Sequence, residues 1–376
     1  MGPGSAGKGS APLSTDAESR EPRTESREPR AESREPRAES REPRAESRIT
    51  FPATHLAPMP PSSLRTLLDG AIDYAGLFPP AQLDMAAAVG RFAEHRAGPD
   101  CWLLGRFVVP VARLDELEGA AAPLLAAEDE AMEKGKKGRA RSGPAAGPWR
   151  LAALLGADVE RDAVRVLQFN SRHATGQRVD VVIDSAEVPA RSREEIERAA
   201  APFRDLGAHL YVELPAGGAD PRPLVDAAFE CGARVKVRTG GVVADAFPSA
   251  AELARVIAAC AAVGVPFKAT AGLHHPLRGD YRLTYAADAP SAPMFGFLNV
   301  FLAAALAREG LPAPELEPLL EERDPAAIAF DDDGATWRAH RLATASLARA
   351  RREALTAVGS CSFAEPVDEL RAMGLL

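Results

Sequence analysis

The chain has 376 residues, 46% hydrophobic and 26% charged, a composition typical of a globular protein with one large core. Its net charge of −8 excludes the chain-wide basic excess that drives nucleic-acid binding, so we expect no nucleic-acid partner. The sequence has no CxxC spacing and no N-terminal apolar stretch, so we expect a cytoplasmic protein. Its longest apolar run, 256–267, is too short to span a bilayer, so we expect no membrane partner.

A heptad repeat, Glu-Ser-Arg-Glu-Pro-Arg-Ala, fills residues 18–48. No position of the repeat holds a large apolar residue, and each repeat contains a proline, so neither a coiled-coil seam nor a continuous helix can form. We predict a disordered, low-complexity tail over residues 1–50, followed by a single domain over residues 51–376.

After the tail, short β-rich runs alternate with amphipathic helical runs, which is typical of a parallel sheet covered by helices. Eight such units predict a (βα)8 TIM barrel, an α/β fold. The predicted strands are 72–77, 103–109, 151–155, 179–183, 209–213, 234–238, 266–270 and 355–358.

Two segments interrupt the alternation. Residues 128–148 are rich in Lys, Arg, Gly and Pro and predict a flexible surface insertion. Residues 294–351 are mainly helical in pattern and form a long insertion before the last strand. A run at 327–330 competes with 355–358 for the role of eighth strand.

Charged residues lie in or just after several predicted strands, where the active sites of such barrels are found. Asp180 and Asp184 have the same parity along one strand and are expected to face the same side. By the same rule Lys236 shares a face with Arg238, and Lys268 shares a face with Thr270. Glu213 ends the predicted strand 209–213, which lies in the chain between the strand of the two aspartates and the strand of Lys236.

Lys236 and Lys268 occur inside apolar runs on neighbouring predicted strands. A buried ammonium is costly, so each lysine needs a partner or a chemical role. Burial and a second ammonium both favour the neutral amine, and we expect a lowered pKa suited to attack on a carbonyl. The alternative is a pair of buried salt bridges, Lys236 with Glu213 and Lys268 with Asp180 or Asp184.

Several segments resemble, in order, the strand motifs of deoxyribose-phosphate aldolase and related class I aldolases. They are Asp180-Val181-Val182, the strand ending in Glu213, Lys236-x-x-Thr239-Gly240 and Lys268-Ala269-x-x-Gly272. The turn Gly359-Ser360-Cys361-Ser362 is similar to the last phosphate-binding turn of that family. The resemblance implies a Schiff base at Lys236, a pKa-lowering role for Lys268 and proton transfer by Asp180.

The sequence also departs from that family. Val237 and Arg238 replace small hydroxyl residues, and His274-His275-Pro276 replaces a glycine-rich phosphate loop. These differences leave the substrate undefined, although Arg238 suits a carboxylate or phosphate.

Two histidines permit a different hypothesis. His274 or His275 could ligate a divalent metal together with Glu213 or Asp184, or act as a general acid or base. Because adjacent residues on extended backbone point in opposite directions, at most one of them is expected to face the site.

Other polar residues are weaker candidates. Asn299 is the one polar residue in the apolar segment 294–301 and could reach a ligand, and Asp73 or Tyr74 could line the barrel mouth.

The sequence therefore predicts an aldolase-like lyase that acts on a small anionic carbonyl compound without a metal or cofactor. The catalytic candidates are Lys236, Lys268, Asp180 and Glu213. The candidates for substrate binding are Arg238, Thr239, Gly240, Thr270, Gly272, His274, His275, Asn299, Gly359, Ser360 and Ser362. The alternatives are a metal-assisted hydrolase or lyase and a barrel that binds a metabolite without converting it; a homo-oligomer is left open.

Overall fold

The computed structural model describes residues 59–135, 147–175, 178–218 and 220–376. The heptad-repeat tail and residues 136–146 of the predicted insertion lie outside the described residues. The flexible insertion was predicted to start at residue 128. This start was wrong, because residues 128–135 continue helix α3 (Leu114–Gly135).

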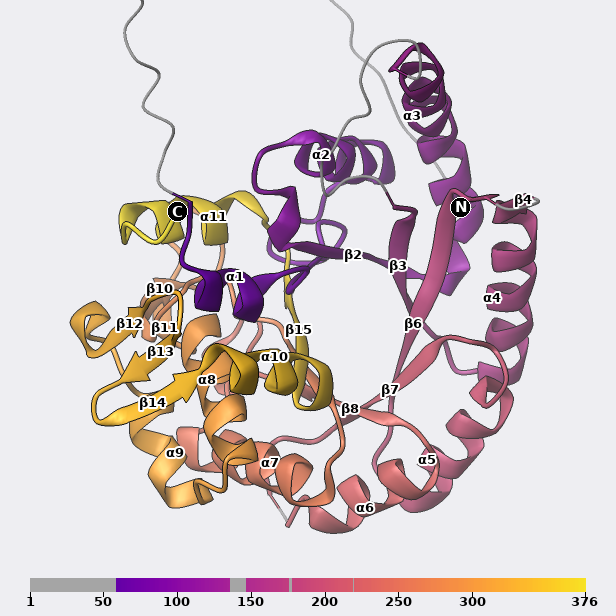
Figure 1. Ribbon diagram of the computed structural model, residues 1–376. Coiled ribbons are helices and arrows are strands. Elements are labelled where there is room, and N and C mark those ends of the chain that lie inside the picture. Colours follow the sequence, from indigo (N-terminus) through magenta and orange to yellow (C-terminus); the bar gives the residue numbers. More distant parts are fainter. Residues whose placement is uncertain (1–58, 136–146, 176–177, 219) are drawn as a thin grey trace, which may run out of the picture. The chain divides into compact units, whose positions relative to one another are not determined.

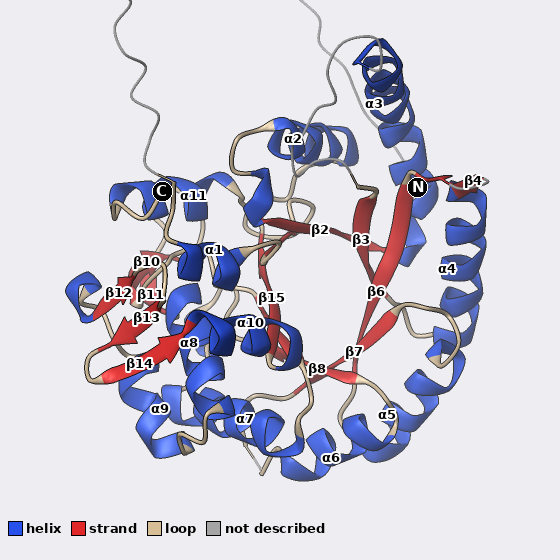
Figure 2. Ribbon diagram, viewed as in Figure 1, coloured by secondary structure: helices blue, strands red, loops and turns tan. Residues whose placement is uncertain are grey.

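Eight parallel strands close into a barrel, and helices surround it (Figures 1 and 2). The order around the barrel is β1-β2-β3-β6-β7-β8-β9-β15, closed by pairing of β15 with β1. This confirms the predicted (βα)8 fold. The strands are β1 (Ile72–Tyr74), β2 (Leu104–Pro110), β3 (Trp149–Leu154), β6 (Val181–Pro189), β7 (His209–Leu214), β8 (Arg234–Arg238), β9 (Phe267–Thr270) and β15 (Leu355–Ser360).

The largest error in the predicted strands concerns β6. It was expected over 179–183 but starts at Val181 and continues to Pro189. Residues 178–179 instead form β5 (Arg178–Val179), which pairs with β4 (Ala174–Thr175) outside the barrel. The apolar run on which the prediction was based stops at Ile183. The strand itself continues through Asp184 and Glu187, whose carboxylates form ion pairs with basic side chains of other strands.

Helices cover the barrel on its outer side (Figure 2). Their amino ends are stabilised by side-chain caps at several positions, including a capping box in which Ser249 and Glu252 exchange hydrogen bonds at the start of α7. The helices are α1 (Ser62–Leu68), α2 (Met85–Ala97), α3, α4 (Val159–His173), α5 (Arg193–Ala200), α6 (Arg222–Glu230), α7 (Ala250–Val263), α8 (Phe297–Arg308), α9 (Ala313–Leu320), α10 (Thr344–Glu353) and α11 (Ala364–Ala372).

The connection between β9 and β15 is long and carries added structure. A hairpin of β10 (Gly279–Arg282) and β11 (Ser291–Met294) precedes α8. A three-stranded antiparallel sheet follows α9 and contains β12 (Ile328–Phe330), β13 (Gly334–Trp337) and β14 (His340–Ala343). The predicted mainly helical segment thus holds three helices and this sheet, and the competing eighth strand is β12, outside the barrel.

The hydrophobic core lies between the barrel and its helices. Outward-facing strand residues pack there, among them Tyr74, Phe107 and Trp149, which surround Phe92 of α2 with ring centroids 5.3–6.3 Å from it. Aromatic packing of this kind stabilises the contact between strands and helices. The interior of the barrel is therefore left to the other face of each strand.

Within the ranges of the chain that the structure describes, one stretch, Ala244–Val263, is long and apolar enough to cross a membrane. It includes α7, whose Leu253 and Ile257 are fully buried and which packs against α6, α8 and α9. We interpret it as one of the helices that cover the barrel, with its apolar face buried in the hydrophobic core of the α/β fold.

Candidate active site

The barrel interior contains a cluster of buried charged side chains. Barrels of this class usually fill their interior with branched apolar side chains. Here, five buried charged side chains occupy it, and they contact one another in a continuous network. They are Asp73, Arg106, Glu187, Lys236 and Lys268.

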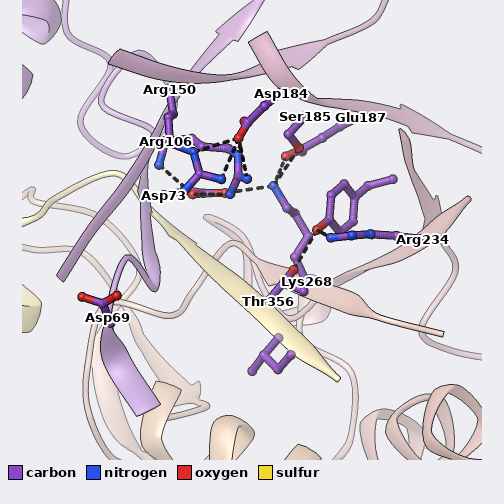
Figure 3. Close-up of polar contacts among 12 residues, drawn as sticks. Asp69, Asp73, Arg106, Arg150, Asp184, Ser185, Glu187, Arg234, Lys268 and Thr356 are labelled. Atoms are coloured by element: carbon purple, nitrogen blue, oxygen red, sulfur yellow. Dashed lines mark hydrogen bonds and ion pairs between the residues drawn. The ribbon is translucent and has the colours of Figure 1, made fainter. Parts of the chain in front are cut away.

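Lys268 lies at the centre of this network (Figure 3). Its Nζ is 2.9 Å from Asp73 Oδ2, 2.8 Å from Glu187 Oε1 and 3.4 Å from Ser185 Oγ. The same ammonium lies 4.5 Å from the centroid of the Tyr211 ring, within range of a cation–π interaction. The Lys268 side chain is only 1% exposed, so it is a fully paired, buried cation.

Lys236 contacts two carboxylates. Its Nζ is 2.7 Å from Glu187 Oε2 and 2.8 Å from Glu213 Oε2. The other oxygen of Glu213 accepts a hydrogen bond from Arg238 at 3.2 Å. Glu187 thus bridges the two lysines through its two oxygens, and the predicted pairing of Lys236 with Glu213 is confirmed.

The carboxylates determine the protonation of both lysines. Burial lowers the pKa of Lys236, but Glu187 and Glu213 outweigh burial and raise it above its usual value. Burial is likewise outweighed at Lys268, where Asp73 and Glu187 raise the pKa. The expected lowering of the pKa by burial and a second ammonium was wrong, because a carboxylate lies between the two ammonium groups.

Asp180 is not part of this network. It precedes β6, and its carbonyl accepts a hydrogen bond from the Trp149 amide at the amino end of the neighbouring strand. The network lies further along β6, at Ser185 and Glu187. The structure therefore does not bring Asp180 to the two lysines as the resemblance implied, and the buried carboxylate that contacts both of them is Glu187.

A bulge in β6 shapes the network. Pairing with β3 shifts between Ile183 and Ser185, which leaves Asp184 as the extra residue. Asp184 binds Arg106 with oxygen–nitrogen distances of 2.5 and 3.0 Å and binds Arg150 at 2.7 Å, while Ser185 faces Lys268 (Figure 3). Asp184 therefore forms ion pairs with two arginines.

A glycine makes room for Asp73. A Cβ at Gly105 would lie 2.4 Å from Asp73 Oδ1 and 3.0 Å from the Gly70 carbonyl. The absent side chain lets the backbone amide of Arg106 donate to Asp73 Oδ1 at 2.8 Å. Asp73 is held between this amide and Lys268, which fixes the carboxylate at the barrel centre.

A cavity of about 310 Å³ opens above the network. Asp73, Glu187 and Lys236 contribute to its polar wall, whereas Lys268 does not line it. The apolar part of the wall includes Phe78, Val108, Leu154, Leu283 and Met294. Such a mixture of apolar surface and a few convergent charges is typical of a small-molecule site.

Several predicted binding residues do line the cavity, namely Arg238, Thr270, Gly272, His274, His275 and Gly359. The side chain of Arg238 is 53% exposed. Among the residues that the structure describes, Thr270 Oγ1 is a buried hydroxyl without a hydrogen-bond partner. Backbone strain is concentrated beside it, because Ala271 has a φ of 67°, a rare value for a residue with a side chain.

Other predicted binding residues have structural roles. The Thr239 hydroxyl donates to the Ala271 carbonyl at 2.7 Å, and Gly240 packs so closely on Phe247 that a Cβ would lie 2.4 Å from its ring. The Ser362 hydroxyl accepts a hydrogen bond from the Glu365 amide at 3.2 Å. None of these three residues lines the cavity.

Asn299 also lies outside the cavity wall. Its Oδ1 accepts a hydrogen bond from the Arg278 amide at 3.0 Å, and its Nδ2 donates to the carbonyls of Leu319 and Glu322 at 2.7 and 2.9 Å. The buried amide ties α8 to the end of α9. The expectation that Asn299 reaches a ligand was wrong, because backbone groups use its hydrogen-bonding capacity.

The two histidines do not converge with Glu213 or Asp184 as a metal site would require. His275 Nδ1 is 2.6 Å from Glu369 and His274 Nδ1 is 3.4 Å from Glu365, both residues of α11. In the described part of the chain, no group of three or more His, Cys, Asp or Glu side chains is arranged to hold a metal ion. The arrangement predicted for a metal centre was therefore wrong.

Glu187 is the main site residue that sequence reasoning missed. A signal for it exists in the segment Ala186-Glu187-Val188-Pro189-Ala190, which repeats the pattern of Val212-Glu213-Leu214-Pro215-Ala216 at the end of the next barrel strand. In both segments the glutamate precedes a proline by two positions and contacts Lys236.

The chain was also compared with known proteins. No protein-family model matches it, and no curated protein is similar to it in sequence.

Proposed function

We propose that this protein is an enzyme that acts on a small anionic carbonyl compound and forms a Schiff base with it at Lys236. The observation that carries the proposal is the position of Lys236, which lines the cavity while its Nζ lies between Glu187 and Glu213. The resemblance to class I aldolases in the order of strand motifs supports the same lysine. We further propose that the protein is cytoplasmic.

Lys268 is less suited to attack a substrate. It does not line the cavity, and two carboxylates hold its ammonium. We assign it the role of a fixed cation that positions Asp73 and Glu187 at the cavity floor. Removing it would leave both carboxylates without their shared partner.

Imine formation requires a neutral amine at Lys236. The ammonium gives a proton to one of its two carboxylate partners, and the amine attacks the carbonyl carbon. The carbinolamine then loses water as a carboxyl group returns a proton to the departing hydroxyl, which leaves the carbon–nitrogen double bond. Because the pKa of Lys236 is raised, this reaction becomes faster as the pH rises above neutrality.

Arg238 and Thr270 are candidates to hold the substrate. The guanidinium of Arg238 lines the cavity and makes one ion pair, with Glu213, so donors remain for a carboxylate or phosphate. The unpartnered Thr270 hydroxyl can bond to a second oxygen of the substrate. This pair favours an anionic compound over a neutral one.

The raised pKa of Lys236 favours a second candidate function. In this alternative Lys236 remains an ammonium and stabilises the negative charge that develops on a carbonyl oxygen, while a carboxylate removes a proton from the adjacent carbon. The product is an enolate, and the overall reaction is an isomerisation or a proton exchange without a covalent intermediate.

Borohydride trapping tests the two candidates. The full-length protein is incubated with pyruvate, acetaldehyde or dihydroxyacetone phosphate, reduced with borohydride and examined by intact mass and peptide mapping. The Schiff-base proposal predicts an adduct on Lys236 that is absent in Lys236→Met and more abundant at pH 9 than at pH 7. An adduct on another lysine would contradict it.

Solvent-deuterium exchange completes the test. If no adduct forms but deuterium enters the carbon beside the carbonyl, and Lys236→Met abolishes this exchange, the enolate mechanism is supported. If neither adduct nor exchange is seen with any compound that binds, the protein is a barrel that binds a metabolite without converting it.

A further inference from the structure

A second group of reactive side chains lies on the cavity wall, on elements different from those of the two lysines. Cys361 directly follows β15 and lines the cavity together with His274, Tyr285 and Glu365. Its Sγ lies 3.4 Å from the Tyr285 hydroxyl and 3.9 and 4.0 Å from the two ring nitrogens of His274. A thiol next to an imidazole is the arrangement that activates a cysteine nucleophile.

Hydrogen bonds around His274 orient its ring. The Ser360 hydroxyl donates to the Ser362 carbonyl at 2.6 Å, so its oxygen can only accept from His274 Nδ1, which lies 2.9 Å away. Glu365 provides a second acceptor 3.4 Å from the same nitrogen. These contacts keep a proton on Nδ1, and Nε2 is left to exchange a proton with Cys361.

The groups around His274 favour its protonated form. Burial lowers the pKa of His274, but its hydrogen bonds with Cys361 and Glu365 outweigh burial and raise the pKa to about 9. The Tyr285 hydroxyl donates to Glu365 at 3.1 Å, and the same hydroxyl lies within reach of the Cys361 sulfur. Desolvation by burial raises the pKa of Tyr285, so the phenol remains a proton donor.

We propose that Cys361 is a second nucleophile of the cavity, paired with His274, which forms a covalent bond with a small soft electrophile that enters there. This inference does not depend on imine formation at Lys236. In the step itself, the neutral form of His274 accepts the thiol proton at Nε2, the sulfur forms a bond to the electrophilic carbon, and the leaving group departs with its electron pair. Iodoacetamide is a suitable probe, because the sulfur displaces iodide from its methylene carbon.

The other cysteines provide an internal standard for the test. Cys101 and Cys231 are more exposed than Cys361, and burial raises the pKa of Cys231. If exposure alone decided reactivity, both would react before Cys361. We expect the reverse, with Cys361 alkylated about tenfold faster than Cys231 at pH 7, because His274 lies beside the Cys361 sulfur and can take the thiol proton as the sulfur attacks.

Site-resolved alkylation of the native full-length protein, followed by peptide mass spectrometry over time, measures these rates. His274→Gln should slow alkylation of Cys361 by about tenfold, since glutamine cannot take the thiol proton. The control variant His173→Gln should leave the rate unchanged, because His173 bonds to Glu118 and does not line the cavity. Tyr285→Phe, at a half-exposed residue, should slow the reaction by a smaller factor, because it removes the hydroxyl that lies 3.4 Å from the sulfur.

Two results would overturn the proposal. The first is alkylation of Cys361 that is no faster than that of Cys231 in the native protein. The second is an unchanged rate in both His274→Gln and Tyr285→Phe when circular dichroism shows that the variants are folded. Fast, His274-dependent labelling confined to Cys361 would support it.

Discussion

The ion pair between Lys236 and Glu187, with Nζ 2.7 Å from Oε2, joins the cavity to the buried interior of the barrel. Glu187 uses its other oxygen for a second ammonium, so one carboxylate compensates two buried cations. A bridging group of this kind affects stability and protonation at the same time. The predictions below separate these effects.

The substitution Glu187→Gln should destabilise the fold by about 3 kcal/mol, because it removes the charge shared by two buried ammonium groups. Urea denaturation monitored by circular dichroism measures this change. The control is Glu230→Gln, which removes a surface ion pair with Arg193 and should produce no measurable change. Equal free energies of unfolding in the two variants would show that the ion pairs of Glu187 with Lys236 and Lys268 do not stabilise the fold.

Acid should destabilise the protein over a defined range of pH. The ion pairs with Lys236 and Lys268 outweigh burial at Glu187 and lower its pKa from 4.5 to about 2. A carboxyl group with a lowered pKa stabilises the fold fully above its unfolded value and loses this contribution as the pH falls. The unfolding free energy should therefore decrease between pH 4.5 and 2, and the decrease should be smaller in Glu187→Gln.

Gly105→Ala should destabilise the protein by about 1–3 kcal/mol, since its Cβ would overlap Asp73 and the Gly70 carbonyl. Gly119→Ala is the matched control. Gly119 lies on α3 with nothing within 4 Å of the position of a Cβ, and the substitution should stabilise the helix by about 0.5–1 kcal/mol. Thermal unfolding of both variants should show shifts of opposite sign.

Asp180→Asn tests the corrected assignment of the buried carboxylate. Under the Schiff-base proposal, the borohydride adduct at Lys236 should form at the wild-type rate in this variant, because Asp180 precedes β6 and is remote from the network along the strand. Time-resolved intact mass gives the rate. Loss of the adduct in a folded Asp180→Asn protein would restore the role that the aldolase resemblance implied.

Asn299→Ala should destabilise the fold by about 2–4 kcal/mol because it leaves the Arg278 amide and the carbonyls of Leu319 and Glu322 without this partner. Urea denaturation measures the loss. Compound binding at the cavity should be unchanged under conditions where the variant is folded. A weakened affinity without a loss of stability would instead indicate contact with a ligand.

The pattern of the chain was sufficient to predict the architecture. Alternation of apolar strands with amphipathic helices predicted the (βα)8 barrel, and charges inside apolar runs drew attention to Lys236 and Lys268. The prediction of the fold was confirmed because it rests on local periodicity, which the folded structure retains. The β6 strand was truncated in the prediction because Asp184 and Glu187 look like strand ends when their partners are unknown.

Only the tertiary structure decided what the charges do. Lys268 contacts Asp73, which is 195 positions away in the sequence, and Glu187, which is 81 positions away. Neither contact can be recognised from a local sequence pattern. These contacts reversed the expected direction of the lysine pKa shifts. They also determined which lysine reaches the cavity, because burial and pairing depend on distances between strands that the order of residues does not specify.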